Sequence, residues 1–178
     1  MTTVWTIGHS TRALDELVAL LRAHAIDTVV DVRTVPRSRR HPQFEKTALS
    51  ETLPQAAIAY THMPGLGGLR KPRPDSPNAG LRNQGFRGYA DYMQTPDFGR
   101  SVMELITLAA GTRAAVMCAE AVPWRCHRSL LADALVARGV QVLHITGRAE
   151  PSAHVLTSWA RREGVRLTYP PAQGELFG

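Results

Sequence analysis

The chain has 178 residues, of which 44% are hydrophobic and 20% are charged, and its formal net charge is +6 at pH 7. This length and balance are typical of one folded domain and exclude a chain that stays disordered. No apolar run approaches the roughly 20 residues of a membrane-spanning helix, and the first residues lack the basic and apolar regions of a signal peptide. We therefore expect a cytoplasmic protein that does not associate with membranes and whose two cysteines are free thiols.

The first third of the chain alternates between apolar runs and a helical period. Residues 4–7 and 28–32 are short apolar runs, each of which predicts a buried strand. Between them apolar residues recur at helical spacing, and Ser10 or Thr11 stands where a helix cap is expected. A strand, a helix and a strand within about 30 residues form a βαβ unit, so the two strands should be parallel.

The rest of the chain continues this alternation. Residues 63–88 are rich in Gly and Pro and fit no period, which is typical of a functional loop or a lid. Residues 89–93 predict a helical turn. The patterns elsewhere predict helices over 44–53, 96–110, 130–138 and 151–163 and strands over 57–62, 113–117, 140–145 and 165–169. We expect a single α/β domain over residues 1–169, with a mostly parallel five- or six-stranded sheet flanked by helices, and a C-terminal tail over 170–178.

Polar side chains follow four of the predicted strands, at the point where each strand ends. They belong to the segments 9–10, 31–33, 62 and 118–120. The carboxyl ends of parallel strands lie at one edge of a sheet, which is where open α/β sheets bind their ligands. We therefore expect five side chains to line one pocket at that edge, namely His9, Asp31, Cys118, Glu120 and Arg128.

The segment 116–129 is the richest in reactive side chains, because it holds both cysteines in a connection from a strand to a helix. Cys126 should lie beside the N-terminus of that helix, where the helix dipole, Arg125 and Arg128 favour its thiolate. Cys118 closes the apolar strand and should be more buried and less acidic. The alternative is structural, with Cys118 a small buried hydrophobe and Cys126 a residue at the helix start.

Three kinds of chemistry suit these residues. The first is thiol catalysis in an anion-binding loop, the second is a zinc or iron site, and the third is acid–base catalysis by carboxylates and histidine on a phosphorylated or nucleic-acid substrate. The candidate catalytic residues are His9, Asp31, Cys118, Glu120, Cys126 and His127. The candidate anion-binding residues are Ser10, Arg33, Arg125 and Arg128, and the candidate pocket residues are His62, Tyr89 and Tyr92. The ligands of a metal site would be Cys118, Cys126 and His127. Structural alternatives remain open for these residues, namely helix capping, ion pairing within the fold and packing in the core.

Positive charge is concentrated between residues 33 and 87, which hold ten Lys or Arg residues against three Asp or Glu residues. Three of the arginines fall within 37–40. Such a zone indicates binding of phosphate groups, in nucleotides or in nucleic acid, or else only a solvated surface.

Ordered motifs over residues 6–146 carry a resemblance to a known family. They are Thr6-Ile-Gly-His-Ser10, Asp31-Val-Arg33, Pro36-Arg-Ser38, Pro42-Gln-Phe44, Tyr60-Thr-His62, Leu66-Gly-Gly68, Phe86-Arg-Gly-Tyr-Ala-Asp-Tyr-Met93, Met117-Cys-Ala-Glu120 and Cys126-His-Arg128. On these motifs the chain resembles the bacterial domain-of-unknown-function family numbered 488. The resemblance implies a compact α/β domain and brings no activity, cofactor or partner with it.

From the candidate site and the charge we expect an enzyme that acts on a nucleotide or nucleic acid by hydrolysis or group transfer. Two alternatives remain, namely a nucleic-acid-binding module without turnover and a metal sensor built on the cysteines and a histidine. The expected partner is a phosphorylated small molecule or a nucleic acid. The sequence indicates neither a cofactor nor an oligomeric state.

Overall fold

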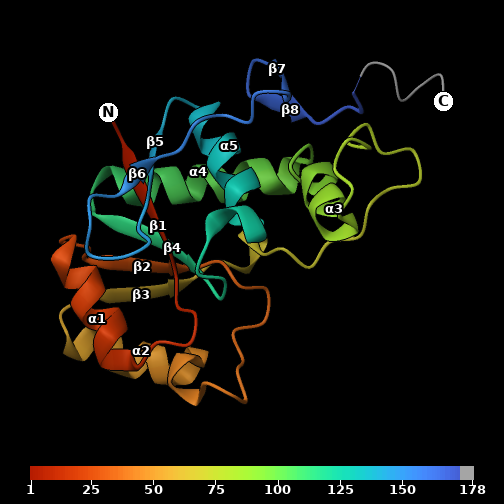
Figure 1. Ribbon diagram of the computed structural model, residues 1–178. Coiled ribbons are helices and arrows are strands. Elements are labelled where there is room, and N and C mark those ends of the chain that lie inside the picture. Colours follow the sequence, from red (N-terminus) through yellow and green to blue (C-terminus); the bar gives the residue numbers. More distant parts are fainter. Residues whose placement is uncertain (173–178) are drawn as a thin grey trace.

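The computed structural model describes residues 1–172, which form one six-stranded sheet with helices on both faces (Figure 1). The strand order is β3-β2-β4-β1-β5-β6, in which β1 to β5 are parallel and β6 runs antiparallel to β5. These strands are β1 (Thr3–Gly8), β2 (Thr28–Asp31), β3 (Ala59–His62), β4 (Ala114–Cys118), β5 (Gln141–His144) and β6 (Ser152–Ala153). The expected α/β fold with a mostly parallel sheet is therefore confirmed.

Five α-helices cover the two faces of the sheet. They are α1 (Leu14–Ala23), α2 (Lys46–Gln55), α3 (Gln84–Tyr92), α4 (Pro96–Ala110) and α5 (Arg128–Val136). The apolar residues of α1 and α2 pack on one face of the central strands, and those of α3, α4 and α5 pack on the other. Val29 and Val30, neighbours in β2, belong to these two opposite cores, because successive side chains of a strand point to opposite faces. The central strands are consequently buried on both sides, in agreement with their apolar sequences.

The parallel register brings the ends of the strands to one edge of the sheet. Gly8 lies beside Cys118, and Asp31 lies beside His62. The pairing of β1 with β4 continues past their ends, because the backbone N–H of His9 donates to the carbonyl of Cys118 at 2.9 Å. The chain segments that the sequence predicts to converge therefore do meet at this edge.

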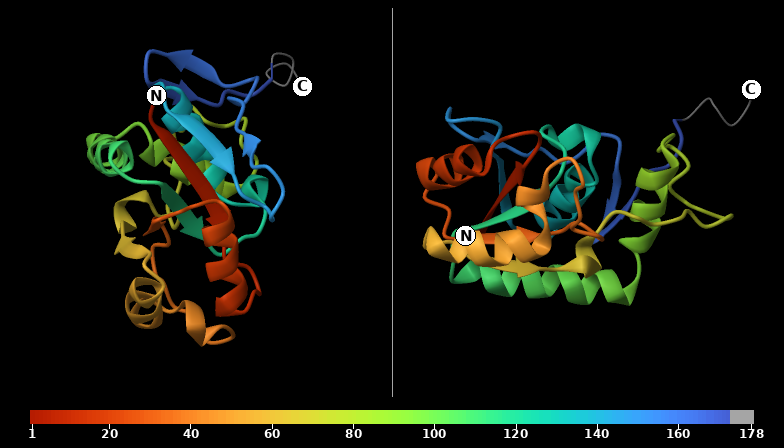
Figure 2. Two further views of the ribbon diagram at one scale, coloured as in Figure 1. Left: turned by 90° about the vertical axis from the view of Figure 1, so that its left-hand side faces the viewer. Right: turned by 90° about the horizontal axis from the view of Figure 1, so that it is seen from below.

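The C-terminal part of the chain differs from the expectation. No helix forms over residues 151–163. This segment instead supplies β6 and then β7 (Arg161–Glu163), which pairs with β8 (Arg166–Thr168) in a hairpin outside the main sheet (Figure 2). The physical reason is a tertiary contact, since the buried carboxylate of Asp133 holds the ring of His154 at 2.7 Å and keeps this part of the chain extended.

The starts of two helices also differ from the expectation. Ser10 has a φ of 51°, in the left-handed region, and α1 begins only at Leu14. Neither Ser10 nor Thr11 is the cap, because Ala13 occupies the N-cap position. The helix α3 begins five residues before the expected helical turn, since the side chain of Asn83 caps it by accepting a backbone N–H.

The irregular segment before α3 is anchored by a buried carboxylate. Asp91 of α3 accepts hydrogen bonds from the hydroxyl of Ser76 at 2.6 Å and from the side-chain amide of Asn78 at 2.7 Å. Asn78 also accepts the backbone N–H of Tyr169 at 2.9 Å, which ties the segment to the chain beyond β8. Hydrogen bonds therefore tie the segment expected to be a functional loop or a lid to the rest of the fold.

None of the described residues belongs to a helix that is both long enough and apolar enough to cross a membrane. Of the expected tail over 170–178, residues 173–178 lie outside the described part of the chain.

Gly8, the last residue of β1, determines how closely the loop after β4 approaches the sheet. A Cβ atom at this position would lie 1.6 Å from the carbonyl oxygen of Glu120, so no side chain fits unless that loop moves. We expect Gly8→Ala to lower the free energy of unfolding by about 1–3 kcal/mol, because it overpacks a buried backbone contact. Chemical denaturation of the purified variant measures the loss.

Gly99→Ala in α4 is the matched control, since a Cβ atom there meets nothing within 4 Å. This variant should gain about 0.5–1 kcal/mol of stability from the helix propensity of alanine. If Gly8→Ala were as stable as the wild type, the close approach of the loop would not be a constraint of the fold.

Candidate active site

A pocket of about 420 Å³ opens at the edge where β1 and β4 end. Its wall comes from the ends of these strands, from the loops that follow β2 and β3, and from the starts of α3 and α5. Seven of the residues predicted from the sequence line it, namely His9, Arg33, Cys118, Glu120, Arg125, Cys126 and His127. The strand ends of β1, β2 and β4 thus contribute to one site.

The two cysteines face each other in the wall of this pocket. Their sulfur atoms lie 3.0 Å apart, with Cys118 2% exposed and Cys126 7% exposed. Cys126 directly precedes His127, the N-cap residue of α5, and so lies beside the helix N-terminus as predicted. Its hydrogen bonds to Cys118 and His127 lower the pKa of Cys126 to about 4, against the opposing effect of burial. The same hydrogen bond to Cys126, together with burial, raises the pKa of Cys118 far above its usual range. Cys126 is therefore the thiolate of the pair near neutral pH, and Cys118 is the thiol.

His127 completes the surroundings of the thiolate. Its Nδ1 lies 3.5 Å from the sulfur of Cys126, and its ring packs on Tyr89 with the centroids 4.9 Å apart. Gly68 lies so close that a Cβ atom there would come within 2.5 Å of Nδ1. The Nε2 atom is buried and has no hydrogen-bond partner among residues 1–172. Packing thus holds the ring with one nitrogen toward the thiolate.

His9 lines the pocket as a neutral ring. Its Nδ1 lies 2.9 Å from the carbonyl oxygen of Ser10, which only accepts hydrogen bonds, so the network assigns the proton to this nitrogen. Its Nε2 lies 3.4 Å from a guanidinium nitrogen of Arg33, and the ring stacks on Phe44 at a centroid distance of 4.3 Å. Burial lowers the pKa of His9 to about 4. Near neutral pH His9 is consequently a weak base whose two nitrogens both have partners.

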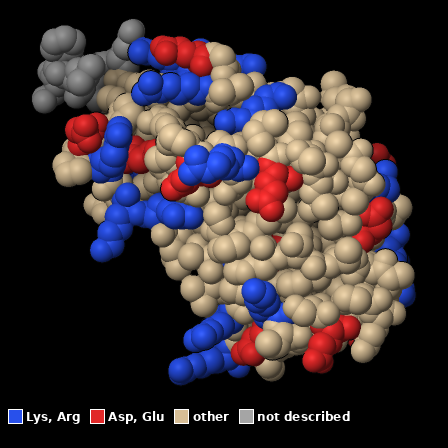
Figure 3. Space-filling view, turned by 180° about the vertical axis from the view of Figure 1, so that it is seen from behind, with Lys and Arg blue, Asp and Glu red and all other residues tan. Residues whose placement is uncertain are grey.

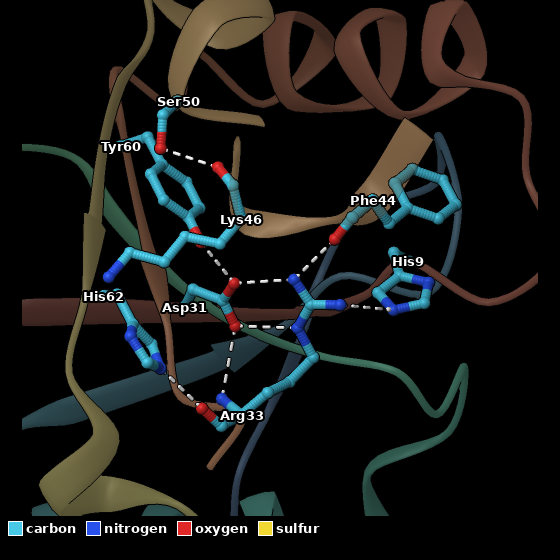
Figure 4. Close-up of polar contacts among 8 residues, drawn as sticks. All are labelled: His9, Asp31, Arg33, Phe44, Lys46, Ser50, Tyr60 and His62. Atoms are coloured by element: carbon cyan, nitrogen blue, oxygen red, sulfur yellow. Dashed lines mark hydrogen bonds and ion pairs between the residues drawn. The ribbon is translucent and has the colours of Figure 1, made fainter. Parts of the chain in front are cut away.

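Asp31 does not line the pocket, contrary to the expectation from the sequence. Its fully buried carboxylate binds Arg33 through both oxygens, with Nε at 2.9 Å and Nη2 at 2.7 Å (Figure 4). Tyr60 donates to the same carboxylate at 2.5 Å, and Nε2 of His62 lies 2.7 Å from the carbonyl oxygen of Arg33. Of these four residues only Arg33 lines the pocket. The cluster therefore acts on the site by fixing the guanidinium of Arg33.

Arg128 is also absent from the wall of the pocket, although we expected it to bind an anion there. It is 1% exposed, and its Nη2 donates to the carbonyl of Glu120 at 2.8 Å and to that of Ala121 at 3.3 Å. Its Nη1 lies 3.4 Å from the hydroxyl of Thr6. The guanidinium thus binds the backbone of the loop after β4 and not a ligand.

A row of buried polar groups continues from Thr6 to α5. The hydroxyl of Thr6 lies 2.6 Å from Nδ1 of His144, whose Nε2 lies 2.9 Å from Nδ1 of His154. Nε2 of His154 then meets Asp133 at 2.7 Å. Burial lowers the pKa of His144 to about 4, so this ring is neutral near neutral pH. The row connects the loop at the pocket to the C-terminal segment.

A second hollow, of about 690 Å³, adjoins the pocket, and the residues that line both are His9, Ser38, Ala119, Glu120 and Arg125. Ser10, expected to bind an anion, lines this hollow and not the pocket. Arg39 and Arg40 are exposed in its wall, and Trp124 is 68% exposed. The second hollow therefore combines guanidinium groups with an accessible aromatic ring.

Lysine and arginine side chains do not form one continuous surface on the face seen in Figure 3. They stand in separate groups there, with Asp and Glu side chains among them. The arginines that can contact a ligand of the candidate site are thus those that line the two hollows.

The two tyrosines expected in the pocket belong to the packing of α3. Tyr89 is fully buried and donates to the carbonyl of Leu66 at 3.1 Å, and Tyr92 donates to the carbonyl of Gly65 at 2.7 Å. Neither ring lines the pocket, so the structural alternative holds for both.

Several residues of the pocket wall carried no functional signal in the sequence. They come from irregular segments and include Thr34, Val35, Ser38, Leu69, Asn83 and Gly85. The path of such segments depends on tertiary contacts that no local period reveals. Gly68 is different, because a Gly-Gly pair is a recognisable sign of close backbone approach.

No group of three or more His, Cys, Asp or Glu side chains within residues 1–172 is placed to hold a metal ion. Two thiolate ligands of a tetrahedral zinc ion stand about 3.8 Å apart, because each Zn–S bond is about 2.3 Å long. The two sulfurs here are 3.0 Å apart. This distance suits a hydrogen-bonded thiol and thiolate better than two ligands of one metal.

An alkylating reagent near neutral pH should modify Cys126 before Cys118, because only Cys126 is ionised there. The rate of iodoacetamide labelling, followed by peptide mass spectrometry, should rise through a midpoint near pH 4 and stay flat around neutral pH. Cys118→Ala should move the midpoint to higher pH, since it removes the main hydrogen bond to the thiolate. First labelling at Cys118, or labelling only after a chelator is added, would contradict this assignment.

A family model described as "Domain of unknown function DUF488" matches residues 13–135. No curated protein and no solved structure matched the chain. The matched range contains Arg33, both cysteines and His127, so it includes most of the pocket wall. It also spans well over half of the 178 residues, which shows that the chain belongs to the DUF488 family, the family that its motifs resemble.

Proposed function

We propose that this protein is an enzyme that catalyses hydrolysis or group transfer. In this reaction the Cys126 thiolate attacks an electrophilic centre of an anionic substrate. A nucleotide or another phosphorylated small molecule is the first candidate substrate. The observation that supports this most is the pair of cysteine sulfurs 3.0 Å apart in the wall of a pocket of about 420 Å³, where the hydrogen bond between them lowers the pKa of Cys126. A thiolate with access to a ligand is the form in which cysteine acts as a nucleophile.

The pocket offers cationic groups for an anion. Arg37 and Arg125 line it, and neither takes part in an ion pair among the described residues. Both guanidinium groups thus remain available to a phosphate or a carboxylate. The volume suits a small molecule such as a mononucleotide.

Glu120 and His127 are the groups best placed for proton transfer. Glu120 is exposed at the pocket, and His127 lies beside the reacting sulfur. His9 and Asp31, the other candidates from the sequence, are taken up by hydrogen bonds within the protein. Attack by the sulfur would form a bond to the electrophilic centre while the bond from that centre to its leaving group breaks, and the leaving group would take its proton from Glu120, from His127 or from water. Water or a second acceptor then attacks the adduct, which releases the transferred group and restores the Cys126 thiolate.

Anions that occupy the pocket should shield Cys126 from alkylation. At saturation we expect inorganic phosphate, AMP and ATP to slow iodoacetamide labelling of Cys126 by at least about threefold, and adenosine to leave the rate unchanged. Any nucleotide that is also turned over should lose about 10³-fold or more of its turnover in Cys126→Ser.

The double variant Arg37→Gln/Arg125→Gln should abolish the protection, because it removes the two unpaired guanidinium groups. Arg166→Gln in β8 is the control, since this arginine lines neither hollow. If no anion protected Cys126, the anionic substrate would be excluded.

A second candidate function is nucleic-acid binding without turnover, which the second hollow favours. The exposed ring of Trp124 lies in the same wall as Arg39 and Arg40. An aromatic ring beside guanidinium groups provides a stacking surface together with partners for phosphate. A single strand, whose bases are free to stack, fits this surface better than a duplex.

Replacing Arg37, Arg39 and Arg40 with glutamine in one triple variant should weaken the binding of single-stranded DNA. It should also flatten the slope of log affinity against log salt concentration by about one for each lost phosphate contact. Fluorescence anisotropy of a labelled oligonucleotide at several salt concentrations measures both effects. A triple control variant should keep the slope, as it changes exposed arginines that line neither hollow, namely Arg100, Arg148 and Arg166. An unchanged slope in the test variant would mean that its arginines form only a solvated surface.

A further inference from the structure

The pocket holds a second thiol, Cys118, which a simple displacement by Cys126 does not require. Cys118 lies 3.0 Å from the attacking sulfur, lines the same pocket and is protonated when Cys126 is a thiolate. A thiol in this place is the nearest nucleophile to any electrophilic sulfur that forms on Cys126. Cys118 is the last residue of β4 and Cys126 lies eight positions later, between the 3₁₀ turn and α5, so the path of this strand-to-helix connection brings the two sulfurs together.

We propose that the Cys118–Cys126 pair reduces small anionic disulfides and closes into an intramolecular disulfide as it does so. This activity rests on the proposed role of Cys126 as the nucleophile and adds a second substrate class to it. The substrate is a disulfide R–S–S–R that carries carboxylates, and a thiol or dithiol reductant returns the protein to its starting state.

The reaction consists of two displacements at sulfur. In the first, the Cys126 thiolate attacks one sulfur of the substrate, a Cys126–S–R bond forms, the substrate S–S bond breaks and one RS⁻ leaves. In the second, Cys118 gives its proton to that RS⁻ or to water, its sulfur attacks the sulfur of Cys126, and the second RS⁻ leaves. Two electrons pass from the protein dithiol to the substrate, which becomes two thiols.

The charges of the pair set the order of these steps. Cys126 attacks first because it is the thiolate, while its hydrogen bond keeps the proton on Cys118. Once Cys126 is bound to the substrate it carries no negative charge, so it no longer opposes the ionisation of Cys118. The guanidinium of Arg128 then favours the Cys118 thiolate, whose pKa it already lowers against the other effects. The second thiol is thus activated by the first step.

The geometry requires little rearrangement for closure. Cys118 is the last residue of β4, and Cys126 follows the short 3₁₀ turn Pro123–Arg125 that leads into α5. The connection between them is irregular, so a small shift of either sulfur does not break a helix or the sheet.

The lining of the pocket favours a negatively charged disulfide. Arg37 and Arg125 have no ion-pair partner among residues 1–172, and both reach the pocket that holds the sulfurs. Glu120 is the one carboxylate among the residues that line this pocket. A substrate with carboxylates should therefore concentrate at the thiolate, and a cationic disulfide should not.

The test uses the full chain in its reduced form, with oxidised glutathione as the anionic disulfide and cystamine as the cationic one. Mass spectrometry of the wild type after oxidised glutathione should show loss of both thiol hydrogens, no retained glutathione and a Cys118–Cys126 disulfide. Cys118→Ser and Cys118→Ala should each retain one glutathione on Cys126. Cys126→Ser should react at least about 100-fold more slowly than the wild type.

The charge of the pocket is tested separately. Arg37→Gln/Arg125→Gln should lower the rate with oxidised glutathione about tenfold and change the rate with cystamine less than about twofold. Arg166→Gln should change neither rate. Equal effects of the double variant on the two disulfides would overturn the preference for anions.

A wild-type protein that keeps glutathione on Cys126 and forms no internal disulfide would overturn the proposal. Iodoacetamide labelling then distinguishes failure of the disulfide activity alone from failure of the proposed function as well. If Cys126 is alkylated readily, only the disulfide activity is wrong. If Cys126 resists iodoacetamide as well, the thiolate nucleophile of the proposed function is also wrong. Circular dichroism of each cysteine variant establishes that it is folded, and the two variants at Cys118 keep the test decisive if one of them does not fold.

Discussion

The buried guanidinium of Arg128 is the constraint on which the site depends. A cation that is 1% exposed loses its hydration, and within residues 1–172 no carboxylate pairs with it. The carbonyl oxygens of Glu120 and Ala121 and the hydroxyl of Thr6 accept hydrogen bonds from its two terminal nitrogens instead, while its Nε has no partner among residues 1–172. Because a desolvated charge without such partners is costly, the loop after β4 must keep these carbonyls turned inward. That orientation leaves the side chain of Glu120 at the pocket and sets the spacing between the end of β4 and the start of α5, on which the distance between the two sulfurs depends.

The sequence predicted the parts of the fold that local patterns determine, and it missed a segment that depends on buried tertiary contacts. The central strands follow from their apolar runs and from the rule that a βαβ unit pairs its strands in parallel, and both hold without knowledge of the tertiary structure. The helix expected over 151–163 rests on a weak period that a buried carboxylate overrides. Polar contacts run from Arg128 through Thr6 to the rings of His144 and His154 and end at the carboxylate of Asp133. This row is assembled from residues far apart in the chain, so no local pattern predicts that it holds the segment extended.

The position of the site could be predicted from the sequence, but the roles of its residues could be predicted only in part. Parallel strands bring their carboxyl ends to one edge, and this alone places His9, Cys118 and Glu120 at one pocket. Asp31 shows the limit of that reasoning. A carboxylate two residues from a guanidinium can face a ligand or bind its neighbour, and the sequence is the same in both cases. Here the bidentate pair with Arg33 satisfies both groups inside the protein, so that only the guanidinium edge reaches the pocket.

The two sulfurs behave as one ionisable unit, and this decides what the pocket can do. A single negative charge suits a pair of thiols that share a hydrogen bond, because the second ionisation would place two like charges 3.0 Å apart in a buried site. The charge rests on Cys126, where His127 and the N-terminus of α5 stabilise it, and the proton rests on Cys118 at the end of an apolar strand. The asymmetry of the two environments thus makes one cysteine a thiolate and the other a thiol. Neither cysteine has this character by itself, since the low pKa of one and the high pKa of the other have the same principal cause.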